Sequence, residues 1–408
     1  YSRWRTFPGR SSRTMMISEE EALSAVLSKV NALAPNKASL LDSLGRFVTR
    51  DLWAQRPLPP FDNSAMDGYA VQAASCQAGR RLRVIGEQPA GVNRSLTVGA
   101  GEAIRIFTGA FLPGGADAVI MQEDVIREGD LITAQFSAEP GEFIRHKGGD
   151  LAEGQKILGR GEQVTAQALA LLASQGLNEI EVGAQPRVAI VSTGNELAPP
   201  GTELKIGQIY ESNALMLQAL AQRSGATVRL VEHCPDDLGQ ITAVFGRGLE
   251  NDALIVSGGV SVGEHDLVKP ALSALGAEID VWRVAIKPGK PFLFGRAGGC
   301  FIFGLPGNPV SAFVTFFRFV RPALLRLSGA AEHQLDLRQI PARLGAEVEN
   351  DGDRPHYLRG RLEGEVFTVT GRQESHALFG LSRANALLRV APHARLAAGT
   401  TVRVALLP

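Results

Sequence analysis

The sequence predicts a multidomain α/β protein whose central domain is a doubly wound, mostly parallel sheet. Between residues 187 and 329, short apolar runs alternate with helical segments, which is typical of parallel strands joined by right-handed helical crossovers. Residues 71–143 hold short apolar runs between turns rich in glycine, proline and asparagine, which indicates a small β domain. Short alternating runs return from about residue 335 to the end and predict a terminal β barrel or sandwich.

Composition limits the possible partners. The 408-residue chain has 42 basic and 42 acidic side chains, so its formal net charge is zero. No global charge would steer it to nucleic acid or to an anionic membrane, and no apolar run reaches the ~18 residues of a membrane span. Cys76, Cys234 and Cys300 are far apart and form no CxxC pair, so we expect neither a disulfide framework nor a thiolate metal site. We therefore expect a cytoplasmic protein.

Two helices flank the β domain and are predicted from their end signals. Ser18 and Glu21 form a capping box at the start of the first helix. The second is predicted over residues 165–175, with Thr165 as its N-cap and Gly176 as its stop. We expect the two helices to pack together, which would leave the β domain as an insertion between them.

The α/β domain can be read as strands, loops and helices in turn. Strands are predicted at 188–191, 227–231 and 253–256, and helices at 213–225, 265–275 and from 308 to about 327. Asn308 and Pro309 supply an N-cap and an N1 proline for the last helix, and Pro322 is expected to kink it.

Ligands bind beyond the carboxyl ends of the strands in an open α/β sheet, and four loops occupy such positions. They are 192–196, 235–237, 257–263 and 304–309. Their glycines let the backbone approach a phosphate, free N–H groups at helix starts bind it, and Thr193, Ser257 and Ser261 add hydroxyl donors. The proline-stiffened loop 286–291, with Lys287 and Lys290, adds charged donors. One such loop is often only a turn, but together they predict a site for a phosphate-bearing anion.

Acidic residues lie on the same predicted rim. Glu196, Asp236 and Asp266 beside a phosphate site favour Mg²⁺, which binds one or two carboxylates together with phosphate oxygens. The alternative is that they are partners of helix N-termini, which suits Asp266 in particular. Outside this domain, Asp67 lies in the polar segment 61–70, which by itself indicates a turn, and Thr108 ends an apolar run. Both would be structural on this reading alone.

Common catalytic motifs do not occur. The seven histidines are scattered without an HExxH pattern, so a histidine metal centre is not expected. The sequence has no GxSxG elbow, no Walker A loop and no GxGxxG after the first strand of the α/β domain. Serine hydrolase, P-loop NTPase and Rossmann dehydrogenase functions are therefore unsupported.

Several long strings resemble one known family, and they occur in that family's order. The strings are PPFDNSAMDGYAV (59–71), TGA (108–110), STGNEL (192–197), SGGVSVGEHD (257–266), IKPGKP (286–291) and GLPGNPVS (304–311). They resemble the molybdopterin molybdenumtransferases of bacterial molybdenum cofactor synthesis, which are related to the E domain of gephyrin. The resemblance runs from about residue 17 to the C-terminus.

The resemblance implies a domain plan that agrees with the patterns above. The predicted parts are a disordered extension (1–14), an elongated helical part (15–56 and 144–185), an inserted β domain (57–143), the molybdopterin-binding α/β domain (186–329) and a C-terminal β barrel (330–408). The resemblance also implies a homodimer, and a reaction in which adenylyl-molybdopterin and molybdate give molybdenum cofactor and AMP with Mg²⁺. A separate adenylyltransferase would supply the adenylylated substrate.

The family's site residues carry over by matching motif. The implied catalytic acids are Asp67, Glu196, Asp236 and Asp266, the last three also as metal ligands. The implied substrate residues are Thr108, Thr193, Gly194, Ser257, Gly258, Gly259, Ser261, Lys287, Pro306, Gly307 and Asn308. The implied molybdate residues are Lys290, Pro291, Ser311, Arg354 and Ser375. Asp67 and Thr108 would reach the site from the other subunit. Asn195 departs from the pattern, because the family often has aspartate there.

Two other functions stay open. A nucleotide pyrophosphatase like the competence-damage proteins would share the α/β domain, but the β insertion and the terminal barrel argue against it. Hydrolysis of ADP-ribose without molybdate would favour it. A scaffold role, as for gephyrin, is opposed by the retained set of acids.

Overall fold

The computed structural model describes residues 16–260 and 266–408, which form two compact units. The first unit contains the described residues up to Arg50 together with Arg160–Leu169 and Asn178–Pro408. The second contains Asp51–Gly159 and Ala170–Leu177. The expected extension 1–14 and the candidate Ser261 lie outside the described residues. Within these ranges, no helix combines the length and the apolar character that crossing a membrane requires.

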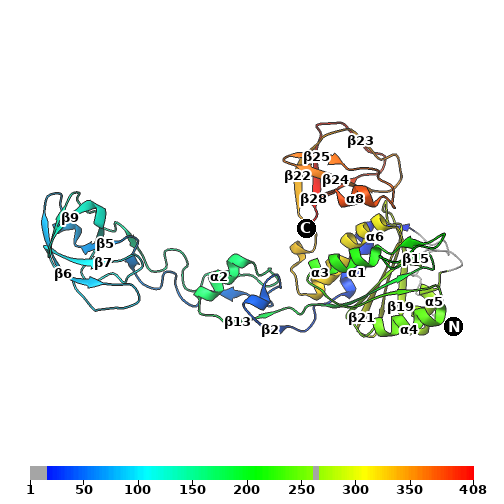
Figure 1. The fold of residues 1–408 in the computed structure, drawn as a ribbon, viewed down its shortest axis with the longest axis horizontal. Coiled ribbons are helices and arrows are strands. Elements are labelled where there is room, and N and C mark those ends of the chain that lie inside the picture. The colour runs from blue at the N-terminus through cyan, green and yellow to red at the C-terminus, as the bar shows by residue number, and fades with distance from the viewer. Residues whose placement is uncertain (1–15, 261–265) are drawn as a thin grey trace. The chain divides into compact units, whose positions relative to one another are not determined.

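A seven-stranded mixed sheet organises the first unit (Figure 1). In spatial order its strands are β1 (Met16–Ile17), β19 (Glu278–Val284), β20 (Pro291–Ala297), β21 (Cys300–Leu305), β18 (Ala253–Ser257), β14 (Arg187–Thr193) and β17 (Thr227–Cys234). Neighbouring strands from β21 to β17 pair in parallel, and β20 is antiparallel to both of its neighbours. Every residue of β18 and β21 is buried, as expected for strands covered on both faces. The predicted mostly parallel sheet is confirmed.

Helices cover both faces of this sheet. Alternate side chains of β14 divide between two cores: Val188 and Ile190 enter one, Ala189 and Val191 the other. The first core holds α1 (Glu19–Lys29), α3 (Asn213–Arg223), α6 (Pro309–Thr315) and α7 (Arg321–Leu327). The second holds α4 (Leu238–Gly248) and α5 (Val268–Ala274). Successive side chains of a strand point to opposite faces of the sheet, so apolar residues at consecutive positions require helices on both faces.

The structure corrects several details of the helices. The capping box at Ser18 is confirmed, but α1 packs on β19 and α7 in the core of the sheet, whereas α2 (Ala166–Ser174) was expected to be its partner. The predicted long helix is interrupted by a π segment, Phe316–Val320, before Pro322. Pro322 lacks the backbone N–H that an unbroken α-helix needs at that point. The backbone hydrogen-bond pattern therefore changes from α to π in the preceding turn. Helix α5 starts three residues later than predicted, and α4 was not predicted.

A closed barrel follows the α/β domain in the same unit. Its strands, in order, are β22 (Gln339–Leu344), β25 (Val366–Val369), β24 (His356–Glu363), β26 (Ala386–Val390) and β28 (Thr401–Leu406). Leu358, Phe367, Leu388 and Val404 fill its core. The predicted β barrel is confirmed, and closure leaves its strands without free edges. A short pair, β2 (Asn36–Ser39) and β13 (Glu179–Val182), also belongs to this unit.

The second unit is built on a six-stranded sheet (Figure 1). Its order is β8 (Ala118–Met121), β5 (Gly68–Val71), β7 (Glu102–Ile106), β6 (Arg81–Gln88), β10 (Leu131–Ala134) and β9 (Val125–Glu128). The turn expected at Asp67-Gly68 lies slightly earlier: residues 65–67 form a bend, and Gly68 begins the fully buried strand β5. A Cβ on Gly68 would collide with the carbonyl of Ile120 on β8, so this glycine permits close strand approach.

Candidate active site

The carboxyl ends of the parallel strands bring the predicted loops to one edge of the sheet. Ser192, Ser257 and Leu305 lie side by side on β14, β18 and β21. Strand β20 runs in the opposite direction, so the lysine loop that precedes it, 286–290, lies at this same edge. The parallel register thus assembles the loops that the sequence predicted for an anion.

Glycines make a tightly packed cradle after β18. The N–H of Gly258 donates to the Leu305 carbonyl at 3.1 Å. Gly258 has φ +95°, and a Cβ there would lie 2.7 Å from the Thr193 carbonyl oxygen. Gly259 has φ +60°, and its Cβ would lie 3.1 Å from Thr193 Oγ1. A Cβ on Gly307 would come within 3.7 Å of the Gly258 Cα, so the three loops are in contact. Only glycine fits the first two positions.

Unpartnered polar atoms line this cradle. Asn213 Nδ2 donates to Ser257 Oγ at 2.9 Å and to the Gly307 carbonyl at 2.6 Å. Among the described residues, the buried atoms Asn213 Oδ1, Ser192 Oγ and Thr193 Oγ1 have no hydrogen-bond partner. Buried polar groups are normally paired, so these atoms are suited to polar groups of a ligand. Sequence reasoning missed Asn213, whose only signal is its position at the first turn of α3.

Gly258→Ala tests the tight packing of the cradle. We expect the free energy of unfolding to fall by about 1–3 kcal/mol, because the substitution combines backbone strain with a steric clash against Thr193. Chemical denaturation of the first unit measures the loss. Gly276→Ala is the matched control, because Gly276 has φ +74° and nothing lies within 4 Å of its Cβ position. Equal losses in the two variants would show that the close approach to Thr193 does not contribute.

The predicted acids occupy different environments. Asp236 and Asn195 join two loops: Asn195 N–H donates to Asp236 Oδ2 at 3.2 Å, and Asp236 N–H donates to Asn195 Oδ1 at 3.0 Å. The Glu196 carboxylate folds over Gly194, where a Cβ would lie 2.5 Å from Glu196 Oε2. No set of three or more His, Cys, Asp or Glu side chains within the described ranges is grouped so that it could hold a metal ion. The predicted metal trio therefore stays a prediction.

Asp266 is the most buried of these acids. Its side chain is 6% exposed, Oδ1 accepts from the Val268 N–H at 3.2 Å, and Oδ2 lies 3.5 Å from Lys269 Nζ. Burial raises the pKa of Asp266, and Lys269 opposes this shift only in part. The surroundings of Asp266 thus disfavour the charged form of its carboxylate.

The lysine loop packs between the barrel and α6. Lys287 N–H donates to the Pro355 carbonyl, and Tyr357 N–H donates to the Lys287 carbonyl, both at 2.8 Å. Arg354 Nη1 donates to the Ile286 carbonyl at 3.1 Å. A Cβ on Gly289, which has φ +121°, would lie 2.7 Å from Thr315 Cγ2. The barrel therefore holds the loop by backbone hydrogen bonds on one side, while α6 packs on the other.

The residues predicted to bind molybdate lie at this contact between the lysine loop, α6 and the barrel. Val310 N–H, on α6, donates to the Ser375 carbonyl at 3.0 Å. The Cβ position of Gly289 lies 3.7 Å from the carbonyl of Ser311, which is also on α6. Lys290 and Pro291 continue the loop into β20, and Arg354 contacts its start. Residues from the lysine loop, α6 and the barrel thus meet, although the barrel is distant in sequence.

Positively charged side chains lie near the contact between the lysine loop, α6 and the barrel. Burial, together with the smaller effect of the nearby charges of Lys287 and Arg359, lowers the pKa of His356 to about 4. Arg359 is fully buried and donates to the carbonyls of Arg372 at 2.6 Å and Glu374 at 3.3 Å, which shapes the loop before Ser375. Sequence reasoning missed His356 and Arg359, because the first five residues of β24 are all buried and show no alternation. Concentrated positive charge in a low-dielectric site favours an anion.

Asp67 and Thr108 form a pair in the second unit. The N–H and the Oγ1 hydroxyl of Thr108 donate to Asp67 Oδ1 at 2.8 and 2.9 Å. The backbone hydrogen bond and then the hydroxyl hydrogen bond lower the pKa of Asp67, so this carboxylate is ionised at neutral pH. All other predicted site residues that the structure describes belong to the first unit.

Comparisons with known proteins agree along almost the whole chain. Family models match residues 17–176 (MoeA N-terminal region, domain I and II), 189–326 (probable molybdopterin binding domain) and 341–407 (MoeA C-terminal region, domain IV). The chain is 38% identical over 403 residues to a Mycobacterium tuberculosis protein called molybdopterin molybdenumtransferase 2, covering 95% of this chain and 99% of the relative. It is 36% identical to the Haemophilus influenzae molybdopterin molybdenumtransferase, covering 90% and 92%. A crystal structure of a Pyrococcus horikoshii molybdopterin biosynthesis MoeA protein is similar, with a TM-score of 0.80, 34% identity and coverage of 96% and 99%.

Proposed function

The chain belongs to the molybdopterin molybdenumtransferase family, and from this premise we propose that it inserts molybdate into adenylyl-molybdopterin and releases AMP. It is a transferase by family. The observation that carries the proposed reaction is that the glycine cradle and the positively charged lysine loop lie at the same edge of the sheet, where Gly307 of the cradle lies just before α6 and Gly289 of the loop packs on α6. A substrate with a phosphate-linked nucleotide and a small dianionic co-substrate require two neighbouring anion sites of this kind.

The cradle is the proposed place of the adenylylated substrate. The glycines of the cradle present backbone without side chains, and Thr193 Oγ1 and Asn213 Oδ1 lack partners among the described residues. These groups would hold the phosphates and the pterin by short hydrogen bonds, which are strong when the acceptor is charged. Binding in this manner orients the P–O bond that is broken when AMP leaves.

Molybdate is the proposed occupant of the lysine loop. Lys287, Lys290 and Arg354 supply positive charge, and the backbone bonds between Lys287 and the barrel limit the entropy lost on binding. Ser311 and Ser375 would add hydrogen bonds to the oxyanion. The dianion would thus be held at the same edge of the sheet as the proposed substrate.

Mg²⁺ is part of this proposal, with one or two of the acids Glu196, Asp236 and Asp266 as its protein ligands, because the described residues do not bring three such side chains together. Asp266 suits this role, because its buried Oδ2 has only the 3.5 Å ion pair with Lys269 and no closer hydrogen bond from the described residues. Phosphate oxygens of the substrate would complete the coordination shell, as they commonly do for Mg²⁺. The ion would neutralise phosphate charge and polarise the P–O bond.

The remaining parts of the proposal concern the protein's assembly, its partner enzyme and its cellular compartment. The chain acts as a homodimer in which Asp67 and Thr108 complete the active site of the other subunit. A separate adenylyltransferase supplies adenylyl-molybdopterin in the cytoplasm. The hydrogen-bonded and ionised Asp67 supports a role for this pair beyond that of a turn.

Release of AMP tests the proposed reaction directly. Purified protein with adenylyl-molybdopterin, Mg²⁺ and molybdate is expected to form AMP in amounts equal to the molybdenum cofactor formed. Omitting molybdate or chelating Mg²⁺ should stop both products, and ADP-ribose should not be hydrolysed. Absence of AMP at saturating molybdate, or hydrolysis of ADP-ribose without molybdate, would overturn the proposal.

A further inference from the structure

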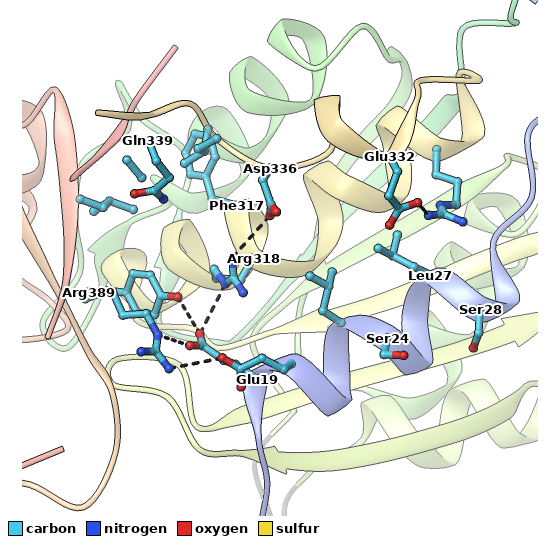
Figure 2. A pocket seen from close by; sticks show the side chains of 17 residues that line it. Glu19, Ser24, Leu27, Ser28, Phe317, Arg318, Glu332, Asp336, Gln339 and Arg389 are labelled. Atoms are coloured by element: carbon cyan, nitrogen blue, oxygen red, sulfur yellow. Dashed lines mark hydrogen bonds and ion pairs between the residues drawn. The ribbon is translucent and has the colours of Figure 1, made fainter. Parts of the chain in front are cut away.

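A cluster of charged side chains around the buried Glu19 joins the first helix to the terminal barrel (Figure 2). Glu19 is the first residue of α1 and is only 1% exposed, which is rare for a carboxylate. The capping box fixes its place, because Ser18 Oγ accepts from the Glu21 N–H at 3.0 Å and Glu21 Oε2 accepts from the Ser18 N–H at 2.8 Å. The cluster borders a cavity of about 850 Å³ between α1, α7 and the barrel.

Three elements supply the partners of Glu19. The Tyr357 hydroxyl, on β24, donates to Glu19 Oε2 at 2.6 Å. Arg389 Nε, on β26, pairs with Oε1 in a close hydrogen bond, and Arg318 Nε lies 3.4 Å from Oε2. Burial raises the pKa of Tyr357, so its hydroxyl stays protonated and remains the donor. The carboxylate is therefore hydrogen-bonded to the barrel twice and ion-paired with the segment between α6 and α7, as Figure 2 shows.

Tyr357 connects this cluster to the lysine loop. Its side chain reaches Glu19, while its own N–H donates to the Lys287 carbonyl at 2.8 Å. Two residues earlier in the barrel, the Pro355 carbonyl accepts from the Lys287 N–H at 2.8 Å. The strand that Glu19 anchors is thus the strand that holds the loop, and Arg354 lies in the same short segment.

We propose that Glu19 is a positioning residue that locks the barrel onto α1 and thereby holds Lys287 and Arg354 in the geometry of the anion site. The role of that site in binding molybdate rests on the proposed function, but the mechanical link does not. Loss of the carboxylate charge leaves Arg389 and Arg318 without their buried partner and loosens the docking of β24. A displacement of about 1 Å at a binding loop can cost on the order of 100-fold in rate.

Hydrogen exchange tests the link without relying on activity. Glu19→Gln retains the shape of the side chain and an oxygen for the Tyr357 hydroxyl, but it removes the charge. We expect the amides of Lys287 and Tyr357 to exchange at least about tenfold faster, since opening of the barrel contact frees both. Amides of the cradle strand β18 should be unchanged.

Steady-state kinetics supply the second readout. In Glu19→Gln the KM for molybdate is expected to rise about tenfold or more, with a smaller change in kcat, because the chemistry itself does not involve Glu19. Glu332→Gln is the matched control: Glu332 borders the same cavity and pairs with Arg326, but its side chain is 76% exposed and does not join the barrel to α1. It should leave exchange and KM as in the parent protein.

The possible outcomes distinguish the positioning role of Glu19 from the proposed reaction. Parent-like exchange at Lys287 in folded Glu19→Gln protein would overturn the positioning role, whatever the kinetics show. Faster exchange with no AMP release from the parent protein would confirm the link and reject the proposed reaction. If Glu19→Gln does not fold, Tyr357→Phe replaces it, because this change removes only the hydroxyl; unchanged Lys287 exchange in that variant would likewise reject the proposal.

Discussion

Asp266→Asn is expected to lower the kcat of AMP release by about 100-fold or more and at the same time to raise the thermal stability of the first unit. The activity falls because the amide provides neither the negative charge for Mg²⁺ nor the electrostatic support of the reacting phosphates. Stability rises because the substitution removes a charge from a side chain that is 6% exposed. AMP release and calorimetric melting, the latter without Mg²⁺ and substrate, measure the two effects.

The sign of the stability effect follows from the pKa. Burial raises the pKa of Asp266 in the folded protein above its unfolded value. The folded state therefore binds the proton more tightly, and this group's contribution to stability is full below the unfolded pKa and is lost as pH rises through the folded pKa. At neutral pH the ionised group costs stability, and asparagine avoids that cost. The gain over the parent protein should disappear as the pH is lowered below both pKa values.

Asp252→Asn is the contrasting control. Although burial acts in the opposite direction, the hydrogen bonds from Arg187 lower the pKa of Asp252. Removing this carboxylate should lower the melting temperature and leave kcat unchanged, because Asp252 is paired at the start of β14, at the other end of the strand from the site. A melting temperature that falls in Asp266→Asn, as it does in this control, would contradict the assignment of Asp266 as a buried, electrostatically strained acid.

Asp67→Ala is expected to lose about 100-fold or more in kcat by itself, yet to recover activity when mixed with Asp266→Asn protein. In the proposed dimer, Asp67 of one subunit serves the site that contains Asp266 of the other. A mixed dimer would then have one site with both acids intact and one with neither. Random exchange of subunits makes half of the dimers mixed, so the mixture should reach roughly a quarter of the parent activity.

The measurement is AMP release after the two variants are denatured together and refolded, with light scattering to verify dimers. Each variant refolded alone is the control and should stay inactive. Mixed dimers without recovered activity would show that Asp67 does not act across subunits. A monomer at working concentration would reject the homodimer itself, because the pair in the second unit could then serve only its own chain.

Local patterns were sufficient for elements whose determinants lie within a few residues. The capping box at Ser18 and the N-cap at Thr165, whose Oγ1 accepts from the Ala168 N–H at 3.2 Å, were predictable because a cap is satisfied by its own helix. The buried strands β14 and β18 were predictable from continuous apolar runs. Gly68 was read as part of a turn, because the reason for a glycine there is the carbonyl of Ile120 on another strand.

The candidate site divides in the same manner. Its glycine loops were predicted from the sequence, since strand ends in a parallel sheet meet at one edge whatever the details of packing. The lysine loop was predicted from two lysines on a chain stiffened by two prolines. Asn213, His356 and Arg359 were missed, because each matters through groups far away in the chain. Arg359, for example, is recognisable only once its carbonyl partners on residues 372 and 374 are known.

By itself the sequence determined the α/β class, the terminal barrel, the loops of the anion site and the family, all of which depend on short-range periodicity or on contiguous strings. Only the tertiary structure decided that α1 belongs to the core of the α/β sheet, that the barrel holds the lysine loop through Lys287, and that Glu19 is buried among Tyr357, Arg389 and Arg318. The physical reason is that burial and pairing of charge depend on which distant surfaces meet. A glutamate in the first turn of a helix looks the same in sequence whether it faces water or is buried against two arginines and a tyrosine.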